Sequence, residues 1–152
     1  MRDSNVKPTV VIADDHRGVL ESLSHLIAPD FEIVATALGG KEAVAAVMRL
    51  RPDIAILDIC MPGVDGIMAA REIRNSGVPS KIVFLTVHRT ADYVRCALEA
   101  GGNGFVLKSR MNAKLVTALS EVLSGNVSVY GTAEQETAWK DDRGSRNTHT
   151  AT

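Results

Sequence analysis

Five short apolar runs recur along the sequence, and four of them end directly before side chains that could take part in chemistry. Asp14 and Asp15 follow the first run, Asp58 follows the third, Thr86 the fourth and Lys108 the fifth. If the runs are parallel strands of one sheet, their carboxyl ends meet at the edge where open α/β sheets bind ligands. The pattern therefore predicts a pocket that contains three carboxylates, a hydroxyl and an ammonium group.

The residue types in this predicted pocket suit a hard cation and a phosphoryl group. Carboxylates without His or Cys ligands favour Mg²⁺ over zinc, because Mg²⁺ prefers oxygen ligands and retains several waters. A lysine opposite them can hold a phosphate oxygen as a point charge, and a threonine hydroxyl can donate to another. Since a carboxylate can itself be the nucleophile and form an acyl phosphate, we expect phosphoryl transfer assisted by the metal.

The elements that must position these residues are predicted to be five βα units. Three of the apolar runs are nearly continuous in Val, Ile, Leu and Phe, as strands buried on both faces should be. The stretches between them repeat apolar residues at helical spacing, with Gly and Pro where turns are needed. We therefore predict an α/β fold with an open, doubly wound parallel sheet. Its strands are expected at residues 9–13, 31–36, 54–57, 81–85 and 104–107.

The composition is that of an ordinary globular chain. Of the 152 residues, 45% are hydrophobic and 23% are charged, and the net charge is −1. These values argue against a largely disordered chain, and the lack of a basic excess argues against a general nucleic-acid or membrane-surface binder. The first residues lack the apolar stretch of a signal peptide, and no apolar run approaches the ~18 residues that span a bilayer. We expect a cytoplasmic protein without membrane contact.

The chain is predicted to hold one domain with polar ends. We expect a disordered N-terminus over residues 1–7, a folded domain over 8–130 and a polar tail over 131–152. The tail has too few apolar side chains to offset its ordering entropy, so we expect it to be disordered or loosely docked. Its Trp139, the only tryptophan, would either dock on the domain or anchor a partner.

The five polar positions, in this order and spacing, resemble the receiver domain of bacterial two-component response regulators. Asp58 lies in the segment LDICMPGVDG, and Lys108 follows GFVL. The resemblance covers roughly residues 8–130, and details around Asp14-Asp15-His16 resemble the NarL/FixJ branch. Members of that branch usually carry a LuxR-type helix-turn-helix after the receiver. The resemblance implies a flavodoxin-like (βα)5 sheet with strand order 2-1-3-4-5.

The resemblance also implies a role for each residue of the pocket. Asp58 would accept a phosphoryl group from the phosphohistidine of a sensor histidine kinase or phosphotransfer protein. Lys108 would pair with Asp58 at rest and with the phosphoryl oxygens afterwards. Mg²⁺ would be bound by Asp15, by Asp58, by the backbone carbonyl of Cys60 and, through water, by Asp14.

A conformational switch is the second implication of the resemblance. Thr86 would move to hydrogen-bond the phosphoryl group, which vacates space into which Phe105 can turn. The fourth helix, fifth strand and fifth helix, about residues 90–124, would carry the change to a downstream protein or a second receiver. Such a chain catalyses only its own phosphotransfer and dephosphorylation, so we do not expect an enzyme that acts on an external metabolite.

The sequence departs from the receiver pattern in three places. Ser109 replaces the Pro that often follows the lysine, so the Lys108–Ser109 bond is either cis, at a cost of about 3–4 kcal/mol, or the loop differs. Phe105 lacks the hydroxyl of the Tyr common at that position. The 22 residues after Tyr130 are too few and too polar for a helix-turn-helix, so no direct DNA binding is expected.

Two other functions remain open at this stage. The chain could be a truncated or diverged transcription regulator that acts indirectly, by pairing with an intact DNA-binding relative. It could also be an aspartyl-phosphate phosphohydrolase, although that class needs a second Asp two residues after the nucleophile, where this chain has Cys60.

The remaining histidines and cysteines are assigned minor roles. His16 and His88 are expected near the mouth of the pocket, and neither has a second His or Cys at ligand spacing. We hypothesise that His88 tunes the access of water to the acyl phosphate. Cys60 and Cys96 form no CxxC motif, and Cys96 is expected to pack on a helical apolar stripe.

Overall fold

The fold is built on a six-stranded, fully parallel sheet, seen in a computed structural model that describes residues 6–140. The strand order is β2-β1-β3-β4-β5-β6. The predicted doubly wound sheet with order 2-1-3-4-5 is therefore confirmed, with one strand added beyond β5. The strands are β1 Thr9–Ala13, β2 Glu32–Ala37, β3 Ile54–Asp58, β4 Lys81–Thr86, β5 Gly104–Leu107 and β6 Ser128–Tyr130.

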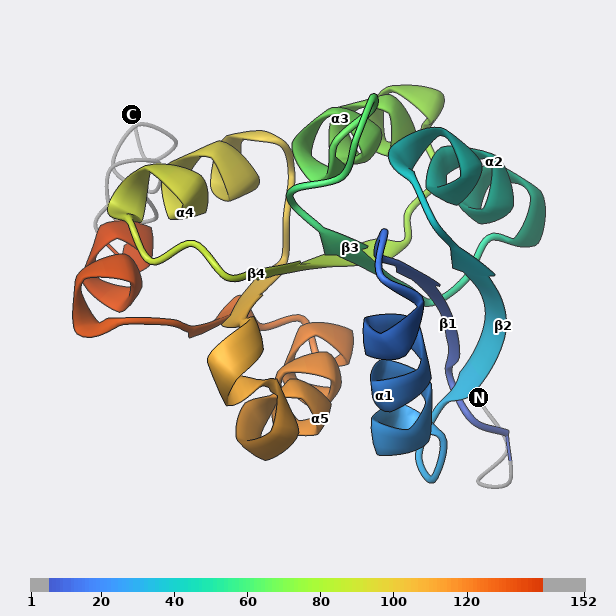
Figure 1. Cartoon of the computed structure of the whole chain (residues 1–152), viewed down its shortest axis with the longest axis horizontal. Coiled ribbons are helices and arrows are strands. Elements are labelled where there is room, and N and C mark those ends of the chain that lie inside the picture. The colour runs from blue at the N-terminus through green and yellow to red at the C-terminus, as the bar shows by residue number, and fades with distance from the viewer. Residues whose placement is uncertain (1–5, 141–152) are drawn as a thin grey trace.

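Helices cover both faces of the sheet. Figure 1 shows α2, α3 and α4 on one face and α1 and α5 on the other. A short 3-10 turn, Lys108–Arg110, joins β5 to α5. The helices are α1 Arg17–Ile27, α2 Gly40–Leu50, α3 Gly66–Ser76, α4 Ala91–Glu99 and α5 Met111–Leu123.

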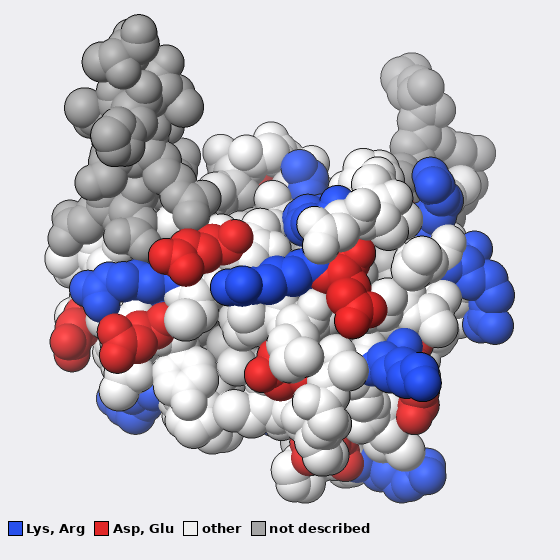
Figure 2. Space-filling model, turned by 90° about the horizontal axis from the view of Figure 1, so that it is seen from above, with Lys and Arg blue, Asp and Glu red and all other residues white. Residues whose placement is uncertain are grey.

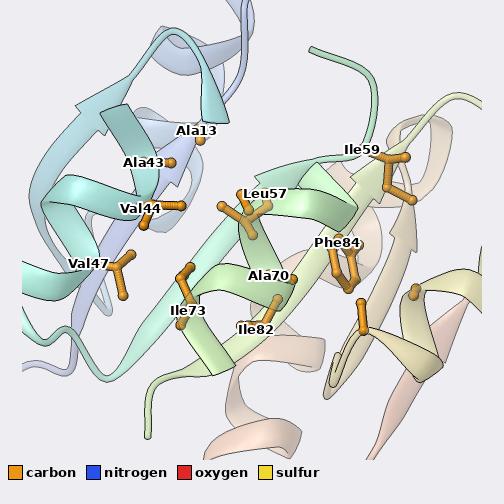
Figure 3. Close-up of a cluster of buried hydrophobic side chains, with 14 of the residues drawn as sticks. Ala13, Ala43, Val44, Val47, Leu57, Ile59, Ala70, Ile73, Ile82 and Phe84 are labelled. Atoms are coloured by element: carbon orange, nitrogen blue, oxygen red, sulfur yellow. The ribbon is translucent and has the colours of Figure 1, made fainter. Parts of the chain in front are cut away.

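Two apolar cores result from the alternation of side chains along the strands. In β1, Val11 and Ala13 belong to the core beneath α2 and α3, whereas Val10 and Ile12 belong to the core beneath α1 and α5. Figure 3 shows the first of these cores, in which side chains of the two helices meet those of β1, β3 and β4. Because the central strands are buried on both faces, their sequences are continuous apolar runs, and the predicted strand bounds agree with the structure to within a residue.

The sixth strand was not predicted from the sequence. Its three residues pair with the first three residues of β5, Gly104 with Ser128 and Val106 with Tyr130. A run of three residues is shorter than the four to eight residues that give a strand pattern, so only the tertiary pairing defines it. As a result β5 is an interior strand and β6 forms the edge of the sheet.

Residues 131–152 were predicted to be a disordered or loosely docked tail. In the structure, residues 133–140 of this tail form a helix beside α4 (Figure 1). Gln135 is 0% exposed and Trp139 is 3% exposed. A count of apolar residues does not predict this helix, because a few buried side chains on one face are enough to dock it. These are Gln135, Ala138 and Trp139, which share one face at helical spacing. Residues 141–152, and residues 1–5 of the predicted disordered N-terminus, lie outside the described residues.

Charges are mixed over the face that carries α2, α3 and α4. Figure 2 shows Lys and Arg interspersed with Asp and Glu on this side, with no extended patch of one sign. In the described part of the chain, no helix is both long and apolar enough to cross a bilayer.

Candidate functional site

Four neighbouring strands deliver polar side chains to one edge of the sheet. Asp58 is the last residue of β3 and Thr86 is the last residue of β4. Asp14 follows β1 directly, and Lys108 follows β5 directly. Since β1, β3, β4 and β5 are consecutive in the sheet, their carboxyl ends bring these side chains together.

Lys108 links two of the carboxylates across the sheet edge. Its Nζ lies 2.7 Å from Asp14 Oδ2 and 3.3 Å from Asp58 Oδ2. The side chains of Asp14 and Asp58 are only 0% and 6% exposed. Burial alone would lower the pKa of Lys108, but the hydrogen bond to Asp14 and the charges of both carboxylates outweigh it, and the pKa is raised. Lys108 is therefore held as a cation between two acids.

Asp58 is a carboxylate in an unfavourable setting. Burial raises its pKa from 3.8 to about 6, and the charge of Asp14 adds to this effect. The charge and hydrogen bond of Lys108 and a hydrogen bond from the Cys60 backbone lower the pKa, but they compensate only in part. An anion that its surroundings neutralise incompletely attracts a further cation.

The acidic residues fit a hard divalent cation. Oxygens of Asp14 and Asp15 and a ring nitrogen of His16 lie within 4.8 Å of one another. Asp14 Oδ1 accepts the His16 backbone N–H at 2.9 Å, whereas the Asp15 side chain is 27% exposed and open to an ion. The single ammonium group of Lys108 cannot balance three carboxylates, and a set of oxygen donors is what Mg²⁺ prefers. The residues present therefore fit Mg²⁺.

Thr86 and Phe105 are both buried in this structure. Thr86 is 0% exposed, and its Oγ1 accepts the backbone N–H of His88 at 3.0 Å. Phe105 is also 0% exposed and lies beside Phe84 in the register of β4 and β5. The Thr86 hydroxyl is thus engaged by the loop that follows β4, and the Phe105 ring is turned into the core.

The Lys108–Ser109 bond was expected to be cis unless the loop after Lys108 differs from the receiver pattern. The described residues contain no cis peptide bond, so the Lys108–Ser109 bond is trans. The chain instead enters a 3-10 turn at Lys108. The turn leads directly into α5.

A contact between Cys60, His88 and Tyr93 was missed by the sequence analysis. Cys60 Sγ lies 3.0 Å from His88 Nε2, and the His88 ring stacks on Tyr93 at 4.3 Å between centroids and 3° between planes. Burial and the charges of Asp58 and Asp65 raise the pKa of Cys60, so its protonated thiol can donate to the ring nitrogen. The register signals this contact: Asp58 pairs with Leu85 across β3 and β4, which brings the following loops side by side.

Cys60 and Tyr93 line an open pocket beside the acidic group. The pocket has a volume of about 600 Å³, and its lining includes Asp15, Met61, Pro62 and both cysteines. Cys96, which was expected to pack on the apolar stripe of its helix, is instead exposed and faces this pocket. The apolar stripe of α4 consists of Ala91, Val94, Ala97 and Leu98.

Comparison with known proteins identifies the family. The response regulator receiver domain matches residues 10–120. The oxygen regulatory protein NreC of Staphylococcus epidermidis is 37% identical over 123 residues, which cover 79% of this chain and 56% of that protein. The chain thus spans little more than half the length of this curated relative.

Solved structures agree with the sequence match. A two-component response regulator of the LuxR family from Aurantimonas sp. SI85-9A1 superimposes with a TM-score of 0.81 and 31% identity, covering 91% of this chain and 99% of that one. CheY of Borrelia burgdorferi, solved in a complex with CheX, BeF3 and magnesium, gives a TM-score of 0.75 and 27% identity, covering 79% of this chain and 92% of its own. The chain belongs to the response regulator receiver domain family.

Proposed function

We propose that this chain is a receiver module that accepts a phosphoryl group on Asp58 in a Mg²⁺-dependent reaction. The observation that carries the proposal is the position of Lys108 Nζ, which contacts both Asp14 and Asp58 at the carboxyl ends of neighbouring strands. The proposal is supported because Lys108 Nζ, the cation that would bind phosphate, contacts both the proposed nucleophile, Asp58, and one further acid, Asp14. The receiver is proposed to cover residues 8–130.

Mg²⁺ would be held by Asp15 and Asp58, by the backbone carbonyl of Cys60 and, through water, by Asp14. When bound, the ion would neutralise charge on the phosphoryl oxygens. Asp15 supports this assignment because its side chain is partly exposed next to the buried Asp14.

Residues of this chain would carry out the transfer of the phosphoryl group itself. A carboxylate oxygen of Asp58 attacks phosphorus, an O–P bond forms, and the N–P bond of a phosphohistidine breaks with its electron pair left on the imidazole. Lys108 then binds a phosphoryl oxygen. The donor would be a sensor histidine kinase or a phosphotransfer protein in the cytoplasm, and the chain would catalyse only its own phosphorylation and dephosphorylation.

The signal would leave through a change in Thr86 and Phe105. Thr86 Oγ1 would turn to donate to the phosphoryl group and give up the His88 N–H that it now accepts. Phe105 would rotate into the vacated space, and the surface of α4, β5 and α5 would present the change to a downstream protein or a second receiver.

A second candidate function is indirect control of transcription. It is favoured by the similarity of the chain to the oxygen regulatory protein NreC and to a response regulator of the LuxR family. The chain would then pair with an intact DNA-binding relative through receiver faces and alter its binding. An electrophoretic mobility shift with that relative, with and without this chain, would separate the two functions, because a receiver with another output leaves the shift unchanged.

The proposal is tested by intact mass after incubation with acetyl phosphate. The parent should gain one phosphoryl group in Mg²⁺ and none in EDTA, and Asp58→Asn should gain none in either. The exposed-site variant Asp30→Asn should behave like the parent, since Asp30 lies in the turn after α1 and is exposed. An adduct on Asp58→Asn, or an adduct of equal yield in EDTA, would contradict the proposal.

A further inference from the structure

Residues 131–140 cover part of the surface through which a receiver would signal. Their helix and α4 line a common groove formed by Ala91, Arg95, Ala133 and Thr137, among others. Trp139 belongs to the same buried apolar cluster as Val94, Ala97 and Phe105. The segment therefore adds to the core on the side of α4 and β5, where a partner would otherwise bind.

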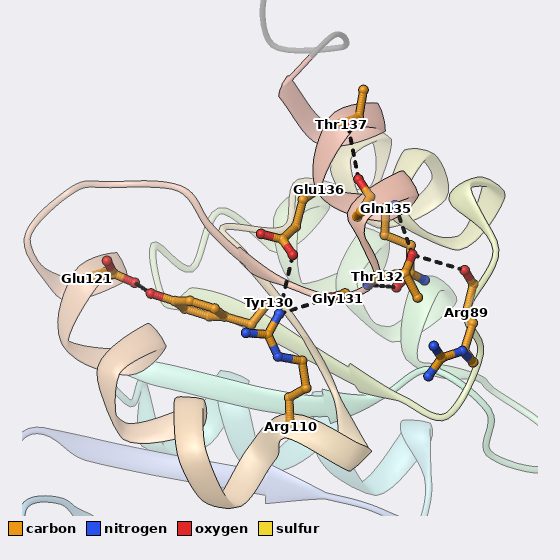
Figure 4. A network of polar contacts seen from close by, with 10 residues as sticks. Arg89, Arg110, Glu121, Tyr130, Gly131, Thr132, Gln135, Glu136 and Thr137 are labelled. Carbon is orange, nitrogen blue, oxygen red and sulfur yellow. Dashed lines mark hydrogen bonds and ion pairs between the residues drawn. The ribbon is translucent and has the colours of Figure 1, made fainter.

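Gln135 ties this segment to the loop that follows β4. Its Nε2 donates to the backbone carbonyls of His88 at 2.9 Å and Thr90 at 3.0 Å. Its Oε1 accepts the Thr132 N–H at 3.0 Å (Figure 4). A fully buried amide with all these bonds depends on the backbone conformation of residues 88–90, because loss of the partners would leave it unpaired in the core.

A second link joins the segment to the loop that follows β5. Arg110 Nη1 donates to the carbonyl of Gly131 at 3.0 Å and lies 3.3 Å from Glu136 Oε2. His88 and Arg110 each lie two residues beyond a residue of the site, Thr86 and Lys108 respectively. The segment is thus bonded to two of the loops that leave the proposed phosphorylation site, those after β4 and β5.

The contacts of the segment also favour a reversible association. Trp139 Nε1 is buried and has no hydrogen-bond partner among the described residues, which opposes docking. The Arg110–Glu136 pair is 35% and 40% exposed, and ion pairs of such exposure stabilise little. Docking therefore depends largely on the Trp139 ring and on the bonds of Gln135.

We propose that residues 131–140 are an internal ligand of the α4 and β5 surface and that phosphorylation of Asp58 releases them. This inference rests on the proposed function. When Thr86 turns towards the phosphoryl group it gives up the His88 N–H, the 88–90 backbone moves, and Gln135 loses the two carbonyls that hold it. The uncovered surface then binds the downstream protein. Because coupling between two equilibria is reciprocal, the docked segment in turn opposes phosphorylation.

Trp139 reports this release directly, since it is the only tryptophan in the chain. In the unmodified full chain its emission should be that of a buried indole and should resist quenching by acrylamide. After acetyl phosphate and Mg²⁺ the emission should shift to longer wavelength and quenching should increase. Mg²⁺ alone, and the full mixture with Asp58→Asn, should leave both properties unchanged.

The reverse coupling is tested with an isosteric pair of variants. Gln135→Glu places a carboxylate against two carbonyl oxygens, so it should expose Trp139 without phosphorylation and speed the reaction with acetyl phosphate about fivefold or more. Glu134→Gln, at the exposed neighbouring position, should match the parent in both measurements. Circular dichroism of Gln135→Glu verifies that the receiver remains folded.

The outcomes separate the two proposals. If intact mass shows the phosphoryl adduct while Trp139 emission and quenching stay constant, the release is wrong and the proposed function stands. If Gln135→Glu exposes Trp139 but reacts at the parental rate, the coupling is wrong. If no adduct forms on the parent, the proposed function fails and the inference fails with it.

Discussion

At the scale of single residues, the site is defined by charges that its surroundings balance only in part. Asp14 and Asp58 are buried, and one ammonium group, that of Lys108, contacts both. Buried charges of like sign oppose folding unless a cation compensates them. The site thus lowers the stability of the free protein, and we propose that a bound metal ion and a phosphoryl group compensate its charges.

Asp58→Asn should stabilise the metal-free protein, and the effect should depend on pH. The folded pKa of Asp58, about 6, lies above the ordinary value of 3.8, so the folded state loses stability as pH rises from 3.8 to about 6. At pH 7.5 the substitution should raise the free energy of unfolding by at most about 3 kcal/mol. This increase should vanish below pH 4. Thermal unfolding in EDTA at pH 4 and 7.5 measures it. An equal difference at both values would contradict the account of Asp58.

His88→Ala should speed hydrolysis of the acyl phosphate several-fold. The ring is held against the loop after β3 by Cys60 at 3.0 Å and by stacking on Tyr93, so we expect its loss to admit water to the site. The measurement is the decay of the phosphoryl adduct after removal of the donor. Arg89→Ala, at the exposed next position, is the control. Equal decay rates in His88→Ala and the parent would dispose of this role.

At the scale of elements, close backbone approaches fix the end of β3. Gly66, the first residue of α3, lies so near that a Cβ there would overlap the backbone carbonyl of Asp58. Asp65 caps the same helix by accepting the Met68 N–H at 2.8 Å. The start of α3 therefore sets the position of the proposed phosphoacceptor.

Gly66→Ala should lower both stability and phosphorylation. The added methyl group meets backbone, which cannot rotate away, and we expect a loss of about 2 kcal/mol or more. Gly18→Ala in α1 meets open space and should raise stability by up to ~1 kcal/mol through helix propensity. Urea unfolding and the acetyl phosphate assay measure the two effects. Parental stability in Gly66→Ala would show that the loop after β3 yields easily.

Trp139→Ala should remove the docked segment without unfolding the receiver. The indole is 3% exposed, and a buried aromatic residue typically contributes about 3–5 kcal/mol. The unpaired Nε1–H reduces this contribution, so we expect Trp139→Ala to lower the free energy of unfolding by about 2–3 kcal/mol. Thr137→Ala, at an exposed position of the same helix, is the matched control for urea unfolding. A loss below about 0.5 kcal/mol would mean that the indole adds nothing to stability.

At the scale of the whole molecule, the sequence predicts the elements that have strong local patterns. Three of the five predicted strands are nearly continuous apolar runs, and the observed strand order places Asp14, Asp58, Thr86 and Lys108 at one edge. The short β6 and the helix after it could not be predicted, because pairing with β5 and docking on α4 define them. The contact of Cys60 with His88 depends on the register of β3 and β4 in the same way.

The whole molecule combines a site at the sheet edge with a covered surface beside it. The loops after β4 and β5 contact both the site and the covered surface. Thr86 of the site accepts the N–H of His88, and the carbonyl of His88 accepts a bond from Gln135. Lys108 of the site begins the loop in which Arg110 donates to Gly131. A local change of charge at Asp58 can therefore alter a surface formed by a different part of the chain. This coupling depends on phosphorylation of Asp58 itself.

The phosphorylated residue is identified by locating the phosphoryl group. The full chain is incubated with acetyl phosphate and Mg²⁺ and then reduced with borohydride, which converts an acyl phosphate to the alcohol and so marks the acceptor with a stable change in mass. Peptide mapping should find this change at Asp58 alone, and EDTA should abolish it. Modification at Asp14 or Asp15 in place of Asp58, or an unmodified Asp58 in a chain that carries a phosphoryl group, would contradict the account.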